Sequence, residues 1–218
     1  MKEKEVAIKK VKDRALTERK LIAAVGSILK KDGFRGLGLN RIAKTAGVNK
    51  NLIYRYFVDV DTLVETYIRK KDFWLAENQE FQEVFNPKAS KEQIIARISD
   101  LLQEQLNYLY NSEEMQQIIL SEISEESKTL KRLSVVRESM AELFFSLTAK
   151  YFENSEINYR AVTAIMSSGI YYMVLQSKKN DAINCGINMR TEQGRETILK
   201  TIRQMIEWSF NYQNIKKQ

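Results

Sequence analysis

Apolar residues recur at the spacing of one helix face along nearly the whole chain, and very little interrupts them. The 218 residues include one proline, Pro87, and eight glycines, so the residues that most often break a helix are scarce. The spacing is helical rather than alternating, and we find no internal repeat. The chain is therefore expected to be all-α.

Capping residues predict where several helices begin and end. Thr17 is expected to cap the first helix, which ends at Gly33 after a basic last turn. Asp59 is expected to cap a helix that continues through Trp74. Ser90 opens a capping box at the start of the next helix. Further helices are predicted at about 113–125, 128–153, 157–179 and 191–213.

The positive charge is concentrated at the N-terminal end. Residues 1–58 contain 15 Lys/Arg against 5 Asp/Glu, a net charge of +10. Residues 59–218 contain 20 against 23, a net charge of −3. A basic block on a slightly acidic body indicates a module that binds a polyanion, joined to a part with another task.

The composition also excludes several kinds of site. There is no histidine and only one cysteine, Cys185, so histidine-based metal sites, catalytic triads and an internal disulfide are excluded. We predict no catalytic residue, metal or cofactor, and Cys185 alone is a weak candidate for a redox sensor. No apolar run approaches the roughly 20 residues that span a bilayer, and the first residues lack the apolar core of a signal peptide. The protein is expected to be cytoplasmic, with no membrane partner.

The stretch "NRIAKTAGVNKNLIYRYF", residues 40–57, predicts two short helices joined by a sharp turn. The first helix is expected at Leu39–Ala46, Gly47 supplies the positive φ of the turn, and Asn49 caps the second helix. Ile53 and Phe57 are expected to be buried. The outward face then carries polar and aromatic side chains: Lys50, Asn51, Tyr54, Arg55 and Tyr56.

This pattern is typical of a helix-turn-helix, whose second helix enters the DNA major groove. Arginine can bind guanine and asparagine can bind adenine through paired hydrogen bonds, while lysine and tyrosine commonly contact phosphates. The alternative is that the stretch is an ordinary amphipathic helix pair. The basic N-terminal block favours DNA.

The segment "GFRGLGLNRIAKTAGVNKNLIYRYF", followed by "VDVDTLVETYI", resembles the N-terminal domain of the tetracycline-repressor (TetR) family of bacterial transcription regulators. The resemblance covers about residues 17–68. It implies a three-helix DNA-binding domain and a larger all-α domain that dimerises and usually binds a small molecule. Two positions depart from the family: Val60 stands where a phosphate-binding lysine is usual, and Tyr56 where histidine is frequent.

The charge distribution predicts a basic tail at 1–14, and the resemblance implies a helix-turn-helix domain at 15–60 and a helical effector-binding and dimerisation domain at 61–218. The expected DNA contacts are Asn40, Arg41, Lys50, Asn51, Tyr54, Arg55 and Tyr56.

The last two predicted helices carry apolar residues on more than one face, so one face can fill the core while another meets a partner. In TetR-like proteins these helices pair with their copies in a four-helix dimer interface, and small residues would permit close approach. Burial within a monomer is the alternative. The expected interface residues are Ser168, Gly169, Tyr172, Ile198, Ile202 and Met205.

Aromatic and methionine side chains in the middle helices are the candidates for an effector pocket, although such residues more often fill a plain core. They suggest an apolar or aromatic effector, whose identity the sequence does not give. The candidates are Tyr67, Trp74, Tyr108, Met115, Phe144, Tyr171 and Met173.

The preferred hypothesis is a repressor that binds a palindromic operator on double-stranded DNA as a homodimer and is released by this effector. The first alternative is a DNA-binding regulator or architectural protein with no small-molecule effector. The second is an enzyme with an appended helix-turn-helix, which the missing histidine and the lack of phosphate-binding loops make improbable.

Overall fold

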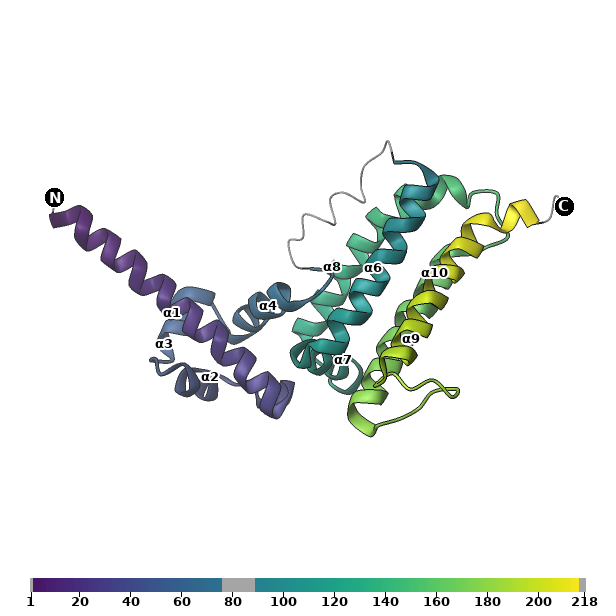
Figure 1. Cartoon of the computed structure of the whole chain (residues 1–218). Helices are drawn as coiled ribbons and strands as arrows, with labels where there is room; N and C mark the ends of the chain where they lie inside the picture. The colour runs from purple at the N-terminus through teal and green to yellow at the C-terminus, as the bar shows by residue number, and fades with distance from the viewer. Residues whose placement is uncertain (1, 76–88, 216–218) are drawn as a thin grey trace. The chain divides into compact units, whose positions relative to one another are not determined.

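The computed structural model describes residues 2–75 and 89–215. Regular structure in these ranges consists of nine α-helices and two short 3-10 helices, with one isolated bridge between Asn184 and Ile187 (Figure 1). The all-α prediction is therefore confirmed. The elements are α1 (Lys2–Asp32), η1 (Phe34–Gly36), α2 (Leu39–Ala46), α3 (Asn51–Phe57), α4 (Val60–Lys71), α6 (Lys91–Asn111), α7 (Glu113–Ser124), α8 (Lys128–Thr148), η2 (Ala149–Tyr151), α9 (Tyr159–Asn180) and α10 (Glu192–Ile215).

The helices pack into two compact units. The first unit combines α1–α4 with α7 and with α8 as far as Val136. The second unit contains α6, the remainder of α8 from Arg137, α9 and α10. Helices α7 and the start of α8 were not expected beside α1–α4. The division at residue 60 into a DNA-binding and an effector-binding domain concerns function and stays a prediction.

The core of the first unit is built on α1, which packs against α2, α4 and α7. Leu21, Val25 and Leu29 follow one face of α1 at four-residue intervals, and none of them is exposed. Ile42 of α2 and Ile53 of α3 are also fully buried. Each such side chain contributes about 1.5–3 kcal/mol through loss of apolar surface to water. This burial holds two helices that are too short to be stable alone.

Most predicted helix ends are confirmed. Gly33 has φ 68°, and its N–H donates to the Leu29 carbonyl at 3.0 Å. Asp59 caps α4 by accepting a hydrogen bond from the Thr62 N–H at 2.7 Å. Ser90 forms the expected capping box with the side chain three residues later.

The predicted start of the first helix is wrong. Helix α1 begins at Lys2, and the Thr17 hydroxyl donates to the Asp13 carbonyl at 2.8 Å instead of capping. Threonine can satisfy its hydroxyl in this way inside a helix, and no proline or glycine precedes Gly26 to stop the helix. The basic tail therefore continues α1 as a helix.

The predicted end of the fourth helix is also wrong. Helix α4 stops at Lys71, because the buried Asp72 side chain accepts hydrogen bonds from the Trp74 and Leu75 N–H groups at 2.9 and 3.2 Å. Trp74 consequently lies in a turn. Helix α8 also ends earlier than the predicted residue 153. It stops at Thr148 and is followed by η2.

In the second unit, α6 packs against both α9 and α10. The buried side chains of this unit include Leu102 of α6, Ile170 and Val174 of α9 and Ile206 of α10. At one end Tyr159 stacks on Phe152 with ring centroids 4.4 Å apart. No helix in the described ranges is long and apolar enough to cross a membrane.

Candidate nucleic-acid interface

The turn between α2 and α3 has the geometry that the sequence predicts. Gly47 adopts a left-handed conformation with φ 64° and ψ 37°, and its N–H bonds to the carbonyls of Ala43 and Lys44. The Val48 N–H also donates to the Ala43 carbonyl at 3.0 Å. A side chain at position 47 would be strained at this φ. The turn therefore fixes the angle at which α3 leaves α2.

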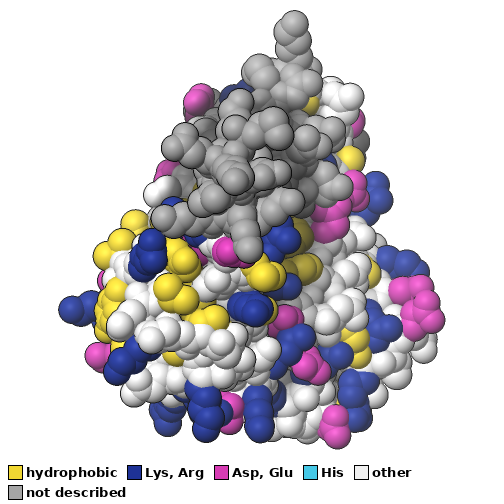
Figure 2. Space-filling model, turned by 90° about the vertical axis from the view of Figure 1, so that its left-hand side faces the viewer, with side chains coloured by type: hydrophobic (Ala, Val, Ile, Leu, Met, Phe, Trp, Pro, Cys, Tyr) yellow, Lys and Arg dark blue, Asp and Glu magenta, His cyan; other side chains and the backbone are white. Residues whose placement is uncertain are grey.

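Helix α3 presents a polar face to solvent and an apolar face to the core. Ile53 and Phe57 are buried, whereas Lys50, Tyr54 and Arg55 are exposed, Tyr54 by 53%. Asn51 is also exposed, and its backbone N–H donates a hydrogen bond to the Asn49 side-chain oxygen at 2.9 Å. Figure 2 views the side on which α1–α3 lie in Figure 1 and shows Lys and Arg side chains spread over the lower part of that face.

Tyr56 is half-buried and lies between two arginines. The Arg14 guanidinium is 5.4 Å from the centroid of the Tyr56 ring, and that of Arg55 is 5.9 Å away. Glu18 holds Arg14 in place through a 2.7 Å ion pair. Sequence reasoning missed Arg14, because it assigned residues 1–14 to a tail rather than to a helix beside α3.

Asn40 and Arg41 stand at the start of α2, and both are exposed. The Arg41 guanidinium makes an ion pair with Asp32, the last residue of α1. DNA would have to compete with this carboxylate for Arg41. The acid at the end of α1 was the sequence signal for this pairing, and it went unnoticed.

The junction between α3 and α4 is strained. Val58 has φ 71° and ψ −53°, and the Asp59 N–H reaches back to the Phe57 carbonyl at 2.8 Å, which makes a tight γ-turn. This conformation is unusual for a β-branched residue. Hydrogen bonds from the backbone and side chain of Thr62 hold the pKa of the Asp59 carboxyl below its ordinary value. Asp59 thus stays ionised as the cap of α4.

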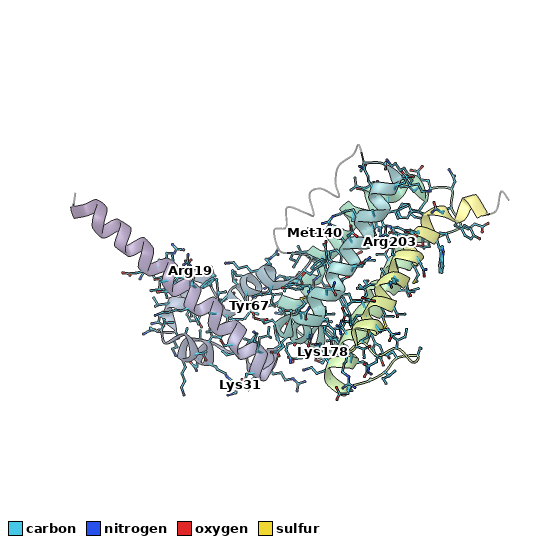
Figure 3. All side chains as sticks on the ribbon, in the orientation of Figure 1. Arg19, Lys31, Tyr67, Met140, Lys178 and Arg203 are labelled. Carbon is cyan, nitrogen blue, oxygen red and sulfur yellow. The ribbon has the colours of Figure 1, made fainter. Side chains whose placement is uncertain are left out.

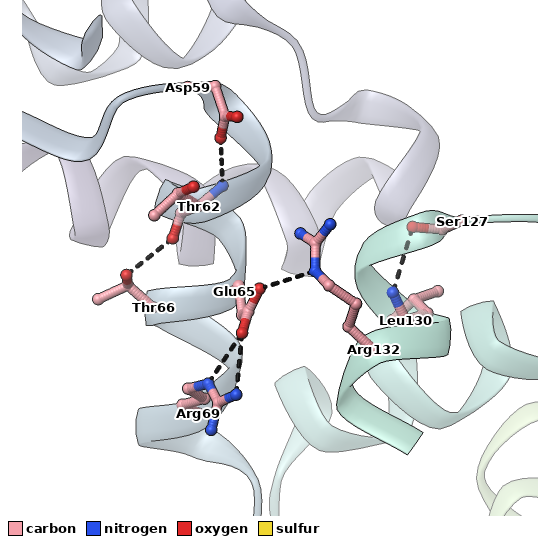
Figure 4. A network of polar contacts seen from close by, with 8 residues as sticks. All are labelled: Asp59, Thr62, Glu65, Thr66, Arg69, Ser127, Leu130 and Arg132. Carbon is pink, nitrogen blue, oxygen red and sulfur yellow. Dashed lines mark hydrogen bonds and ion pairs between the residues drawn. The ribbon is translucent and has the colours of Figure 1, made fainter. Parts of the chain in front are cut away.

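A polar network continues along α4 from this cap (Figure 4). The Thr66 hydroxyl donates to the Thr62 carbonyl at 2.7 Å. Three residues after Thr62, the Glu65 carboxylate accepts hydrogen bonds from Arg69 and from Arg132 of α8. Helix α4, which follows α3, is therefore tied to α8 within the first unit.

Residues 21–67 match the family model described as bacterial regulatory proteins, tetR family. The chain carries the DNA-binding domain of the TetR family. It is accordingly a helix-turn-helix transcription regulator that binds DNA, and TetR regulators are not enzymes. The matched range includes α2, the Gly47 turn and α3, so the polar face of α3 is the expected DNA-reading surface.

Solved structures with the same fold include NalD of Pseudomonas aeruginosa, the secondary repressor of the MexAB-OprM multidrug efflux pump. NalD is 16% identical, with 88% of this chain and 96% of that chain covered and a TM-score of 0.59. A TetR-family regulator from Streptomyces coelicolor is 14% identical, with 90% and 82% covered and a TM-score of 0.52. At these identities the likeness concerns the TetR fold alone. The comparison with curated proteins gave no match.

The residues predicted to bind an effector are divided between the two units. Tyr67, Trp74 and Met115 belong to the first unit, and Tyr67 and Met115 are buried there. The others belong to the second unit and are half-buried: Tyr108, Phe144, Tyr171 and Met173. Their part in effector binding stays a prediction.

The buried Gln105 of α6 was missed by sequence reasoning. Its Nε2 donates to the Tyr171 hydroxyl at 2.8 Å, and the residue is only 1% exposed. A glutamine at a core position of an amphipathic helix was the available signal.

The residues predicted for the dimer interface divide into exposed and buried groups. Ser168 and Tyr172 are exposed and Gly169 and Met205 are half-buried, whereas Ile198 and Ile202 are 9% and 5% exposed within one chain. Two further apolar side chains on the same helices are exposed, Ile165 at 69% and Trp208 at 61%, and of these Trp208 was missed. The single Cys185 is exposed in the turn between α9 and α10.

Proposed function

We propose that the protein is a repressor that binds a palindromic operator as a homodimer and leaves it when a small effector binds. The observation that carries the proposal is the exposed polar face of α3, held in place by the buried Ile53 and Phe57 behind the Gly47 turn. Its side chains suit base edges and phosphates. The proposed DNA contacts are Asn40, Arg41, Lys50, Asn51, Tyr54, Arg55 and Tyr56.

The proposed dimer interface is an apolar stripe on α9 and α10. Ile165, Ser168 and Tyr172 recur on α9 at intervals of three and four residues, so they lie on one face. Trp208 on α10 is equally exposed. A monomer would leave these large side chains in water, whereas a two-fold dimer buries them and supplies two α3 helices for two half-sites. The buried Ile198 and Ile202 would support this face from beneath.

The proposed effector site in the second unit centres on Gln105 and Tyr171. The Gln105 Nε2 is bonded to Tyr171, while its buried Oε1 has no hydrogen-bond partner in the described part of the chain. A buried acceptor left in this way costs about 1–3 kcal/mol. Tyr108 lies three residues further along the same face of α6. An apolar or aromatic effector that also carries a hydrogen-bond donor fits this arrangement.

The operator can be identified by selecting duplexes from a random pool with the purified full-length protein. We expect two inverted half-sites whose centres are about 10 base pairs, or a multiple of this spacing, apart on one DNA face. Selection of a single half-site, or of no sequence at all, would contradict the palindromic operator. Deleting the protein should raise expression of a reporter placed beside the selected site; a fall would make it an activator.

The effector proposal is tested by screening aromatic amines and phenols for compounds that raise the unfolding temperature. A cognate compound should weaken operator binding, and the operator should weaken its binding by the same factor in calorimetry. Gln105→Leu should reduce its affinity, whereas Gln103→Leu on the same helix should not. If no stabilising compound changes operator affinity, the protein is a DNA-binding regulator without an effector.

A further inference from the structure

A groove of about 410 Å³ lies between α1 and α4 in the first unit, next to the start of α7. It is distinct from the proposed effector site, which lies in the second unit. Arg19 and Lys30 border it from α1, Lys70 and Lys71 from α4, and Glu114 from α7. Figure 3 shows Arg19 on α1 and the labelled Tyr67 at α4.

The floor of the groove is apolar and depends on one glycine. A Cβ at Gly26 would lie 2.7–2.9 Å from the ring and hydroxyl of Tyr67, so the tyrosine lies directly against the α1 backbone. Ile22 and Ala23 continue this surface one turn earlier on α1. Glycine in the middle of a helix costs about 0.5–1 kcal/mol relative to alanine. The close approach of Tyr67 explains why a glycine occupies position 26.

The rim of the groove is strongly positive. Glu114 is the single carboxylate among the lining residues, and it lies 3.3 Å from Lys30 and 3.9 Å from Lys71. Partial burial opposes ionisation of Glu114, but these two lysines outweigh it and lower the pKa of the carboxyl. Arg19 and Lys70 have no ion pair in the described ranges 2–75 and 89–215. Four cations against one carboxylate leave the lining with an excess of three positive charges.

The groove faces away from the helices that read DNA. Ile28 of α1 is turned toward η1 and α2, since a Cβ on Gly36 would lie 3.0 Å from its Cγ2 and 3.4 Å from Arg41. Successive helical residues advance by 100°, so Gly26 and Lys30 stand about 160° around the helix axis from Ile28. A duplex bound by α2 and α3 is therefore on the opposite side of α1. The cations of the groove are left to a smaller ligand.

We propose that this groove binds a small organic anion with a flat apolar body, such as an aromatic carboxylate or sulfonate. The acid group lies between Arg19 and Lys70, and the apolar body covers Ile22, Ala23 and the Tyr67 ring. An anion in the groove also fixes the spacing between α1 and α4. Both of these helices pack beside α2 and α3, so the anion affects how α2 and α3 are held.

The test uses two fluorescent dyes that share the same aromatic body and differ by one sulfonate group. 8-Anilinonaphthalene-1-sulfonate is the anionic probe, and N-phenyl-1-naphthylamine, which lacks the sulfonate, is its neutral counterpart. Arg19→Gln and Lys70→Gln should each weaken one sulfonate site by about fivefold to tenfold, because a charge-assisted bond is lost. They should leave the affinity for the neutral dye unchanged. Ala23→Trp, at an exposed position on the floor, should abolish that site for both dyes.

The matched control is Lys44→Gln, which removes an exposed cation of α2 away from the groove. Dye sites elsewhere persist in every variant, so the comparison isolates the groove. Equal sulfonate affinity in Arg19→Gln, Lys70→Gln and wild type would overturn the proposal, as would an equal loss in Lys44→Gln. The proposal would also be overturned if Arg19→Gln and Lys70→Gln lowered the affinity for a 30-base-pair duplex and made that affinity less dependent on salt. The groove would then be a DNA contact.

Discussion

Arg132 donates from Nε to the Glu65 carboxylate at 3.2 Å, although the two residues are 67 positions apart in the chain. The other oxygen of Glu65 accepts two hydrogen bonds from Arg69 at 2.9 and 3.0 Å. Glu65 is only 20% exposed. One carboxylate therefore joins α4 to the start of α8.

Removing this carboxylate should lower the stability of the protein. Glu65→Gln is expected to reduce the free energy of unfolding by about 0.5–1 kcal/mol, and Arg132→Gln by less, because Arg132 is half-exposed. Urea denaturation of both variants and of the double variant measures the coupling. A double variant whose loss equals the sum of the single losses would mean that the pair contributes nothing by itself.

The exposed face of α3 should carry DNA affinity without carrying stability. Lys50→Ala is expected to weaken operator binding several-fold and to reduce its salt dependence by about one phosphate contact. Tyr54→Phe should weaken binding while leaving the unfolding free energy within about 0.5 kcal/mol of wild type. Lys44→Ala on α2 is the control. Full affinity in both α3 variants would reject these two contacts.

The strained turn after α3 should be improved by glycine. A side chain in such a conformation costs about 1–3 kcal/mol of stability. Replacing it by glycine removes this strain but costs about 0.5–1 kcal/mol, because glycine gives the unfolded chain more entropy. Val58→Gly is therefore expected to stabilise the protein by about 1 kcal/mol. The control, Val135→Gly at another exposed valine, should destabilise it, because that residue lies inside α8. Thermal unfolding distinguishes the two, and a less stable Val58→Gly would show that the turn is not strained.

The exposed stripe on α9 and α10 should determine the oligomeric state. Tyr172→Ser and Trp208→Ser are expected to raise the dimer dissociation constant at least tenfold, as expected when a large aromatic side chain is removed from an interface. Ile183→Ser is the control, since this exposed apolar residue lies in the turn outside both helices. Sedimentation velocity over a range of concentrations gives the result. Dimers of unchanged strength would place the interface elsewhere.

The sequence predicted best the features that depend on neighbours in the chain. The bounds of α2 and the left-handed turn followed from Gly47 and the apolar spacing around it. The caps at Asp59 and Ser90 followed from side chains that bond two or three residues away. These features are local, so one sequence contains all the information that they need.

Contacts between distant residues were beyond this reasoning. The spacing of Glu65 and Arg132 in the sequence does not predict their ion pair. No sequence pattern predicted that Arg14 lies over the Tyr56 ring. The apolar stripe through Ile198 predicted a buried face but could not say whether the chain itself or a partner buries it. Thr17 misled because a hydroxyl serves equally well at a helix start and inside a helix.

The first unit is made of two separate stretches of chain, which limits how this regulator can be re-engineered. A fragment that ends at residue 75 would lack α7, whose Ile118 and Ile119 are almost fully buried and whose Glu114 pairs with Lys30. An N-terminal fragment moved into another protein without α7 would expose the apolar surface that these side chains cover. Chimeric regulators built from this protein should exchange both stretches together, with the junction in α8 near Val136.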